Sequence, residues 1–414
     1  MSSNKRKIIN DPVYGFISIP SDLIFEIIQH PFFQRMRRIK QLGLTELVYP
    51  GAIHTRFHHA LGSLHLMKSA LDTLRAKGHF IYDTEYEATL IAILLHDIGH
   101  GPFSHTLEST LLKGVRHEEL SIEIIKELNR QFQGKLDFAL QVFQNKYPRK
   151  FLNQLVSSQL DIDRLDYLRR DSFFTGVQEG TIGSERIIKM MNIVDDELVI
   201  EEKGIYSIEN FLNARRLMYW QVYLHKTTVC AEKMLIKVIE RARYLCKNNE
   251  LTIDNSLQIF LDKDFRLNDF TSIELLNQYC SLDDFDIWSA LKKWSACKDK
   301  VLSRLCNALL NRNLFKTTFL KDSIPQADLN QLKKMIASKF SLDESETTFM
   351  IASGSVSNSA YLAEGHIKIL TKGGSVVDIT DATDLPNIQA MQKNVRKYFI
   401  CWPPEINFNF LSVQ

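Results

Sequence analysis

The chain has 414 residues, of which 45% are hydrophobic and 24% charged, and its formal net charge is only +2. This length and composition predict a soluble globular protein of two or three domains with a sizeable core. The small net charge does not indicate nucleic-acid binding, although local basic runs are compatible with anion sites. The longest strongly apolar run, Leu90–Leu95, is too short to span a bilayer, and residues 1–7 lack the apolar stretch of a signal peptide. We therefore expect a cytoplasmic protein with no membrane partner.

Histidine is concentrated in one part of the chain, because nine of the twelve histidines lie between His54 and His117. This window contains the runs RFHH at 56–59 and HDIGHGPFSH at 96–105. Histidine is a common metal ligand, and its pKa near neutrality suits it to proton transfer. The six cysteines are scattered without a Cys-x-x-Cys pair, which argues against a zinc finger or a disulfide framework. The histidine window is therefore where we expect the chemistry.

Two predicted helices carry the first candidate metal ligands. One opens near His59, and the other spans Glu85–Leu95 and is followed by glycines that stop it. His96 and Asp97 then fall at the end of the second helix. Neighbouring residues do not share a helix face, so the end of a helix is where the backbone can direct both side chains at one ion.

The segment 159–171 supplies the remaining candidate ligand. If this segment is helical, Asp163, Tyr167 and Arg170 share one face, and Arg164 and Asp171 flank it. Taken alone, the pattern is more typical of a solvent-exposed helix with internal salt bridges. Together with the histidine window, it favours a metal ligand, a hydroxyl and a cation on one face.

The rest of the body is predicted to be mostly helical. Residues 193–200 have the pattern of a short hairpin, and a long helix is predicted from about Ser207 to Lys247. Residues 272–279 and 284–310 also have helical patterns.

The pattern changes near Asn311, where short strands and helices begin to alternate. We expect strands at 315–320, 347–352, 366–370, 376–379 and 397–402, and helices at 327–340 and 387–395. The stretch 353–359 is interpreted as a plain loop, because it lacks the Gly-Lys-Ser/Thr ending of a phosphate-binding loop. The sequence therefore predicts a mainly α fold, with a helical core over residues 1–310 and a small C-terminal α+β lobe over residues 311–414.

The order of His59, His96–Asp97 and Asp163 matches the H…HD…D motif of the HD-domain metal phosphohydrolases. More specific sequence motifs surround it: INDPVYG at 9–15, IKQLG at 39–43, YPGA at 49–52, and the runs at 56–59, 96–105 and 161–171. On these motifs, residues 7–230 resemble the deoxynucleoside triphosphate triphosphohydrolase branch of that family. Beyond residue 230 the resemblance is architectural.

The resemblance implies a metal centre and an activity. A single divalent transition-metal ion (Fe, Mn, Zn, Co or Ni) would be held by His59, His96, Asp97 and Asp163, with Mg²⁺ accompanying the substrate triphosphate. The phosphates would lie along the catalytic group of His100, His105, His117 and Glu108, and His105 would donate a proton to the departing 5′ oxygen. The family reaction is attack at the α-phosphorus, which releases deoxynucleoside and inorganic triphosphate.

The resemblance also implies a substrate pocket. The positions that hold the triphosphate and the sugar match Arg56, Arg164, Tyr167, Asp171, Arg215, Tyr223 and Lys226. Gln41 and Leu42 match a loop that closes on the deoxyribose and leaves little room for a 2′ hydroxyl. Leu224 stands where a relative has glutamine, which removes one polar contact to the sugar or base.

A regulatory nucleotide and an oligomer are further expectations from the family. Lys7, Asn10, Gln34 and Arg37 match part of the family's regulatory nucleotide site. Gln29 replaces the acidic residue that recognises guanine in that site. Guanine-specific activation is therefore not expected. We expect a homo-oligomer, a dimer or a tetramer, with the lobe at 311–414 contributing contacts or regulation.

Three interpretations remain open from the sequence. The first is a deoxynucleoside triphosphate triphosphohydrolase. The second is an HD-domain phosphohydrolase that acts on another phosphoester, such as a phosphomonoester, guanosine tetraphosphate or a cyclic nucleotide. The third is a nucleotide-sensing or nucleic-acid-binding protein with a structural metal, although structural sites are usually closed and spare histidines favour an open one.

Overall fold

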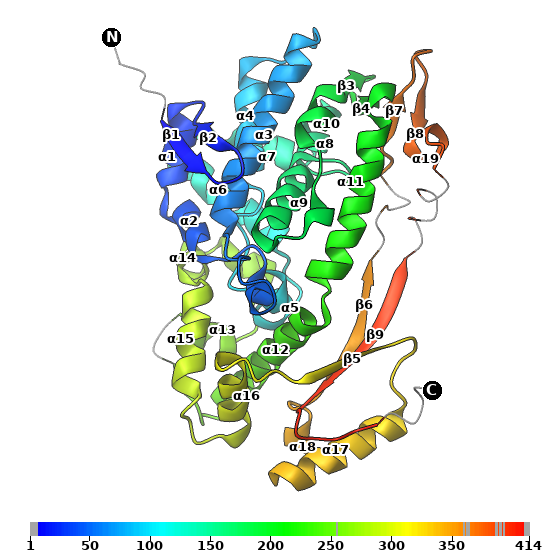
Figure 1. Cartoon of the computed structure of the whole chain (residues 1–414). Helices are drawn as coiled ribbons and strands as arrows, with labels where there is room; N and C mark the ends of the chain where they lie inside the picture. Colours follow the sequence, from blue (N-terminus) through cyan, green and yellow to red (C-terminus); the bar gives the residue numbers. More distant parts are fainter. Residues whose placement is uncertain are drawn as a thin grey trace.

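The structure of the protein is a computed structural model that describes residues 7–253, 256–358, 361, 365–385, 388, 391 and 394–409. The described residues are mostly helical, as the sequence predicts, and their strands form small sheets. Figure 1 shows a helical body, with a sheet and helix α17 (Gln326–Phe340) at its lower right. Within the described part, no helix combines the length and apolar character needed to cross a membrane.

Three helices form the centre of the body. Helix α3 (Arg56–Ala76) packs against both α4 (Asp83–Leu95) and α9 (Ile162–Thr175). Helix α4 is buried along its whole second half, from Ala88 to Leu95, which explains why its sequence has no polar face. The end of α4 and the starts of α3 and α9 therefore lie inside the core.

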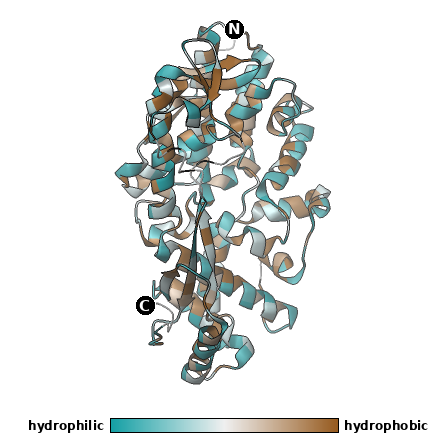
Figure 2. Cartoon of the chain, turned by 90° about the vertical axis from the view of Figure 1, so that its right-hand side faces the viewer, coloured by the Kyte–Doolittle hydropathy of each residue, from teal (hydrophilic) through white to brown (hydrophobic). Residues whose placement is uncertain are grey.

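The remaining elements of the body surround these three helices. An antiparallel hairpin, β1 (Ile8–Asp11) and β2 (Gly15–Ser18), comes first. The surrounding helices are α1 (Asp22–Gln29), α2 (Pro31–Gln34), α5 (His105–Leu111), α6 (His117–Gln131), α7 (Asp137–Phe143), α8 (Lys150–Val156), α10 (Ser184–Met190), α11 (Ile205–Met218), α12 (Lys226–Lys247), α13 (Leu257–Asp262), α14 (Ile273–Ser281), α15 (Asp284–Trp294) and α16 (Lys300–Leu310). Figure 2 shows hydrophilic and hydrophobic residues alternating along the helices, the pattern expected of amphipathic elements around a core.

Two long helices of the sequence prediction are each divided in the structure. The helix predicted over 207–247 is wrong as a single element: α11 is followed by a π-helical turn, Tyr219–Tyr223, and α12 begins only at Lys226. The backbone of His225 is extended (φ −60°, ψ 132°), and its ring accepts the Thr227 N–H, so it caps a new helix. Residues 284–310 likewise form α15 and α16, because Asp299 caps the second helix.

The tail forms one small sheet and extends a second one. In the first, β9 (Val395–Trp402) lies between β5 (Lys316–Leu320) and β6 (Ala352–Asn358), and all pairs are antiparallel. In the second, β7 (Lys368–Leu370) pairs in parallel with β4 (Glu197–Glu201) of the hairpin that β4 forms with β3 (Met191–Val194). The elements β8 (Val376–Asp378) and α19 (Ile379–Ala382) follow. Figure 1 shows β7 and β8 beside β3 and β4, at the upper right.

Two predictions for the tail are wrong. The strand predicted at 347–352 is mostly the end of helix α18 (Glu344–Thr347) and a turn, and only Ala352 belongs to a strand, β6. The predicted loop at 353–359 is mostly strand β6. This polar stretch is extended because it pairs with β9 along seven residues, which local composition does not reveal. The helix predicted at 387–395 falls largely outside the described residues, and its last residue, Val395, begins β9.

Candidate metal centre and adjoining pocket

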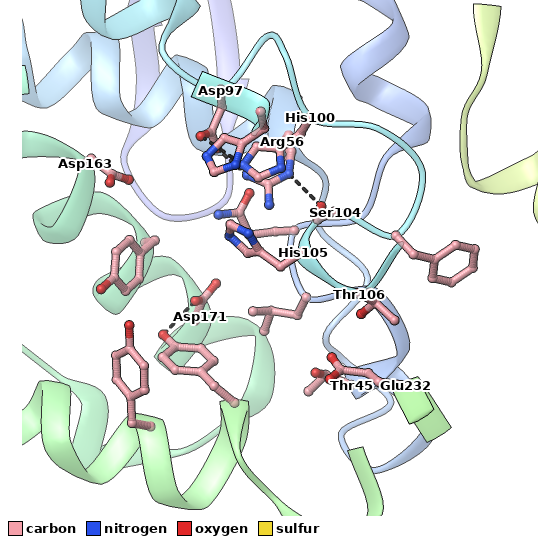
Figure 3. Close-up of a pocket in the computed structure, with 18 of the residues that line it drawn as sticks. Thr45, Arg56, Asp97, His100, Ser104, His105, Thr106, Asp163, Asp171 and Glu232 are labelled. Atoms are coloured by element: carbon pink, nitrogen blue, oxygen red, sulfur yellow. Dashed lines mark hydrogen bonds and ion pairs between the residues drawn. The ribbon is translucent and has the colours of Figure 1, made fainter. Parts of the chain in front are cut away.

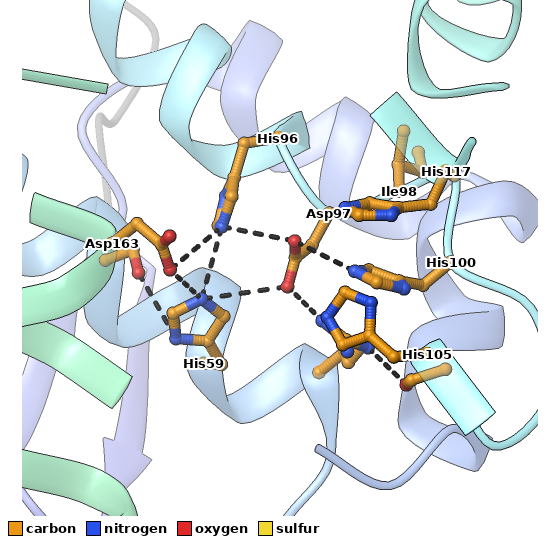
Figure 4. Close-up of polar contacts among 12 residues, drawn as sticks. His59, His96, Asp97, Ile98, His100, His105, His117 and Asp163 are labelled. Atoms are coloured by element: carbon orange, nitrogen blue, oxygen red, sulfur yellow. Dashed lines mark hydrogen bonds and ion pairs between the residues drawn. The ribbon is translucent and has the colours of Figure 1, made fainter. Parts of the chain in front are cut away.

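Four side chains converge where α3, α4 and α9 meet. His59 Nε2 lies 3.2 Å from His96 Nε2 and 3.1 Å from Asp163 Oδ1. His96 Nε2 is 3.4 Å from Asp163 Oδ1 and 3.4 Å from Asp97 Oδ1. Figure 4 shows these side chains pointing toward one another. The ligand atoms of His59, His96 and Asp163 lie within 4.8 Å of one another, which is close enough for one ion to contact them all.

A second contact orients each imidazole of the cluster. His59 Nδ1 lies 2.7 Å from a carboxylate oxygen of Asp166, and His96 Nδ1 lies 2.7 Å from the carbonyl oxygen of Ile93. With the ring proton on Nδ1, each Nε2 presents a lone pair to the shared point. Asp166 is itself held by the buried guanidinium of Arg170. The helix packing thus fixes both rings in the orientation that a metal requires.

The electrostatics of the cluster favour a cation. Burial lowers the pKa of His59, but hydrogen bonds to Asp163 and Asp166 outweigh it and raise this pKa to about 10. Burial alone would raise the pKa of Asp163, yet its bonds to His59 and His96 hold it well below its usual range. A divalent ion would satisfy the same demand for positive charge. Imidazole and carboxylate donors suit first-row transition metals, so the residues present fit such an ion.

Asp97 links this cluster to Arg56 and His100. Arg56, the first residue of α3, forms an ion pair with Asp97, and its Nε donates to Ser104 Oγ at 2.8 Å. The other oxygen of Asp97 lies 3.4 Å from His100 Nε2. Burial, with Arg56 beside it, holds the pKa of His100 well below its ordinary value. His100 is therefore a neutral ring next to a fixed cation.

The three remaining histidines of the site form a second cluster around Glu108. The rings of His100 and His117 stack with centroids 3.8 Å apart, and His105 lies edge-on to both. The Nδ1 atoms of His105 and His117 each lie 3.2 Å from Glu108 oxygens. Burial would raise the pKa of Glu108, but these bonds hold it well below its usual range. The result is a carboxylate shared by two imidazoles, one of which, His105, is 69% exposed.

A pocket of about 520 Å³ adjoins both clusters. The predicted site residues that line it are Gln41, Leu42, Arg56, Asp97, His100, His105, His117, Asp163, Arg164, Tyr167, Asp171 and Tyr223. Figure 3 shows Asp97 and Asp163 in its upper part and Thr45, Thr106 and Glu232 at its lower right. The pocket therefore has a basic, histidine-rich end and a distant end with one carboxyl group.

Asp171 connects the pocket wall to the core. It accepts a hydrogen bond from Tyr223 Oη at 2.8 Å, and its other oxygen lies 2.7 Å from His54 Nε2. Burial raises the pKa of Tyr167 and Tyr223 well above the ordinary value, so both phenols stay protonated. His54 is itself buried.

Some predicted residues lie outside the pocket lining. Arg215 is buried and donates to Gln159 at 3.2 Å, and Lys226 is exposed at the start of α12, beyond the break at His225. Glu108 meets the pocket through the histidines that it binds. Their functional roles stay predictions.

The predicted regulatory residues lie apart from the pocket lining. Arg37 Nε donates to Gln34 at 2.9 Å, Lys7 lies 3.0 Å from the centroid of the Phe25 ring, and Asn10 is exposed on β1. Nucleotide binding there stays a prediction.

Sequence reasoning missed several lining residues, among them Thr45, Phe103, Ser104, Thr106, Glu118 and Glu232. Ser104 was within reach, because it belongs to the run at 96–105. Glu232 was not, because a glutamate on an amphipathic helix looks like a surface residue. In the structure, burial raises the pKa of Glu232 to about 7, against the opposing effects of Lys233 and a bond to Thr106.

Comparisons with known proteins agree with this geometry. Residues 56–171 match the HD domain, and residues 182–267 match the HD associated region. An uncharacterized protein of Bacillus subtilis, YwfO, is 35% identical over 320 residues, which cover 76% of this chain and 72% of the relative. A SAMHD1 homolog of Dictyostelium discoideum, named as a deoxynucleoside triphosphate triphosphohydrolase, is 28% identical over a region that covers 79% of this chain and 62% of the homolog. The crystal structure of a phosphohydrolase from Bacteroides thetaiotaomicron is 50% identical, with a TM-score of 0.93 over 96% of this chain and 100% of that one. The chain therefore belongs to the HD-domain phosphohydrolase family.

Proposed function

We propose that the protein hydrolyses deoxynucleoside triphosphates at the α-phosphorus, giving deoxynucleoside and inorganic triphosphate. The observation that carries this proposal is that one pocket is bordered by the candidate metal centre, by the histidine cluster and by the Gln41–Leu42 segment. The SAMHD1 relatives, which are named as deoxynucleoside triphosphate triphosphohydrolases, support the substrate class.

The proposed roles at the basic end follow from charge and exposure. A divalent ion held by His59, His96, Asp97 and Asp163 would supply a water of lowered pKa and polarise the phosphate, with Mg²⁺ entering on the triphosphate. Arg56 and Arg164 hold phosphate oxygens, and buried His100 adds a neutral contact. His105 is exposed beside the pocket, and its Nδ1 lies 3.2 Å from Glu108, so we assign it the role of passing a proton to the departing 5′ oxygen.

The remaining wall accommodates the nucleoside. Leu42 and Gln41 face the sugar together with Tyr167 and the Tyr223–Asp171 pair. The base then extends toward the end lined by Glu232. Homo-oligomerisation and activation by a second nucleotide stay predictions.

The test is a product analysis. The protein is incubated with Mn²⁺ and each of the four deoxynucleoside triphosphates, alone and as a mixture, and the products are separated by anion exchange. Inorganic triphosphate with deoxynucleoside supports the proposal, and turnover in the mixture alone would reveal activation. Monophosphate with pyrophosphate would place cleavage at another bond and reject the mechanism. The absence of any product would redirect attention to other phosphoesters.

A further inference from the structure

Asp284 connects two segments of the pocket wall, although it lies beyond both regions that match the family models. Its side chain is buried, and each carboxylate oxygen accepts one backbone N–H: Oδ1 from Phe103 at 2.7 Å and Oδ2 from Lys40 at 2.9 Å. Phe103 belongs to the pocket segment 103–106, and Lys40 directly precedes Gln41 and Leu42. One carboxylate therefore joins two parts of the wall that are far apart in sequence.

The segment that contains Phe103 needs an external support. Phe103 and Ser104 both have positive φ values, 54° and 48°, in a region that residues other than glycine rarely adopt. Such a conformation persists only where the surrounding structure holds it. Trp288, one helical turn after Asp284, packs edge-on against the Phe103 ring with centroids 5.8 Å apart. Helix α15 thus holds Phe103 by its backbone and by its side chain.

Ser104 continues these contacts toward the metal centre. Its hydroxyl accepts from Arg56 Nε at 2.8 Å and lies 3.5 Å from the carbonyl oxygen of Lys40. Arg56 is paired in turn with the candidate metal ligand Asp97. The residue after Ser104 is His105, which begins α5. A shift of the 103–104 backbone would therefore move the proposed proton donor and the partner of the metal ligand together.

The neighbouring carboxylate has a different task. Asp283 is the N-cap of α15: it accepts the Phe285 N–H at 2.9 Å, and it pairs with Arg38. The two aspartates thus have different roles, because Asp283 caps helix α15 whereas Asp284 binds the two pocket segments. This division provides a matched control.

We propose that Asp284 is a positioning residue that sets the Gln41–Leu42 segment against the 103–105 segment, and so sets the width of the sugar site and the place of His105. The effects on sugar and leaving group rest on the proposed function, whereas the effect on the two backbones does not. Asp284 touches no substrate in this arrangement, and it acts through the segments that it binds.

Asp284→Asn is the decisive variant, because an amide has one acceptor oxygen and would turn its own N–H groups toward a donor. We expect kcat/KM for deoxynucleotides to fall roughly 10- to 100-fold, as for other supporting contacts. The preference for deoxynucleotides over ribonucleotides should fall as well, with metal content unchanged. Asp283→Asn should keep both the rate and the sugar preference within about twofold of the parent. A parent-like rate and sugar preference in Asp284→Asn would overturn the proposal.

Backbone amide exchange, followed by mass spectrometry, separates this proposal from the proposed function. Faster exchange in segments 40–44 and 101–106 of Asp284→Asn, but not of Asp283→Asn, supports positioning even if the parent hydrolyses no deoxynucleotide. That absence of hydrolysis would reject the proposed function alone. Unchanged exchange in both segments rejects positioning whatever the activity. If Asp284→Asn does not fold, Trp288→Leu is used in its place. We expect faster exchange in this variant at 101–106 only. Parent-like exchange at 101–106 would count against the proposal.

Discussion

The metal side and the substrate side of the pocket are built in different ways. His59, His96 and Asp163 come from three helices at the centre of the body, and each imidazole has a second bond that orients it. The opposite wall comes from residues 41–45, from residues 103–106, which lead into α5, and from the region around the break between α11 and α12. The core itself therefore holds the ligand side, whereas the substrate side depends on contacts from elements such as α15. Rigid elements suit a metal site, and connecting segments are where specificity usually varies.

Removing a ligand from the core side should give the largest effect. Asp163→Ala deletes the carboxylate that lies 3.1 Å from His59 and 3.4 Å from His96, so we expect loss of bound metal and of hydrolysis by more than about 10³-fold. Elemental analysis and product formation measure both. Asp83→Ala, which changes a 98% exposed side chain at the start of α4, should retain both. Full activity in a metal-free Asp163→Ala protein would contradict the metal-dependent mechanism.

The histidine cluster lies between the two sides, and it should affect rate without affecting metal. His105→Gln removes the proposed proton donor, and we expect kcat to fall about 10²- to 10⁴-fold with metal content unchanged. His65→Gln, in a partly buried ring 5.1 Å from Tyr14 and outside the pocket lining, is the control. If both variants turn over at the parental rate in single-turnover experiments, the proton has another donor.

The substrate side should respond in selectivity more than in rate. Leu42→Gly opens the segment that faces the sugar, so we expect hydrolysis of ribonucleoside triphosphates to rise by about 10-fold relative to deoxynucleotides. Leu42→Met keeps the bulk and should keep the preference. The ratio of kcat/KM for matched ribo- and deoxynucleotides is the measurement, and equal ratios in all three proteins would show that Leu42 does not exclude the 2′ hydroxyl.

The smallest effect is expected at the far end of the pocket. With its pKa near 7, Glu232 is mainly neutral below pH 7, where it can donate and accept, and mainly charged above pH 7, where it only accepts. The relative kcat/KM values of the four deoxynucleotides should therefore shift a few-fold between pH 6 and pH 8 in the parent, on the order of one hydrogen bond. Glu232→Gln cannot titrate and should remove this shift. The same shift in both proteins would assign it to another group.

The sequence predicts the metal side of the pocket better than the substrate side, because sequence patterns reveal only contacts between residues that are close along the chain. The helical prediction for the segment that contains Asp163 is confirmed by α9. The sequence could indicate this helix because Asp163, Tyr167 and Arg170 recur at helical spacing within a few residues. The division at His225 was missed, because a π-helical turn has no simple pattern in composition. Asp284 could not be found either: its partners Lys40 and Phe103 are 244 and 181 residues away, and only tertiary packing brings them together. That the clustered residues bind metal and substrate stays a prediction.

The parallel pairing of β4 with β7 has a consequence for how the chain is made. It joins Ile200 to Ile369 and Glu201 to Leu370. The β3–β4 hairpin of the body is therefore synthesised nearly 170 residues before the strand that pairs with it. Until then, β4 is an open strand edge on an emerging chain, and such edges attract other strands. We therefore expect the helical centre to fold during synthesis, and this edge to be closed only after β7 has been made.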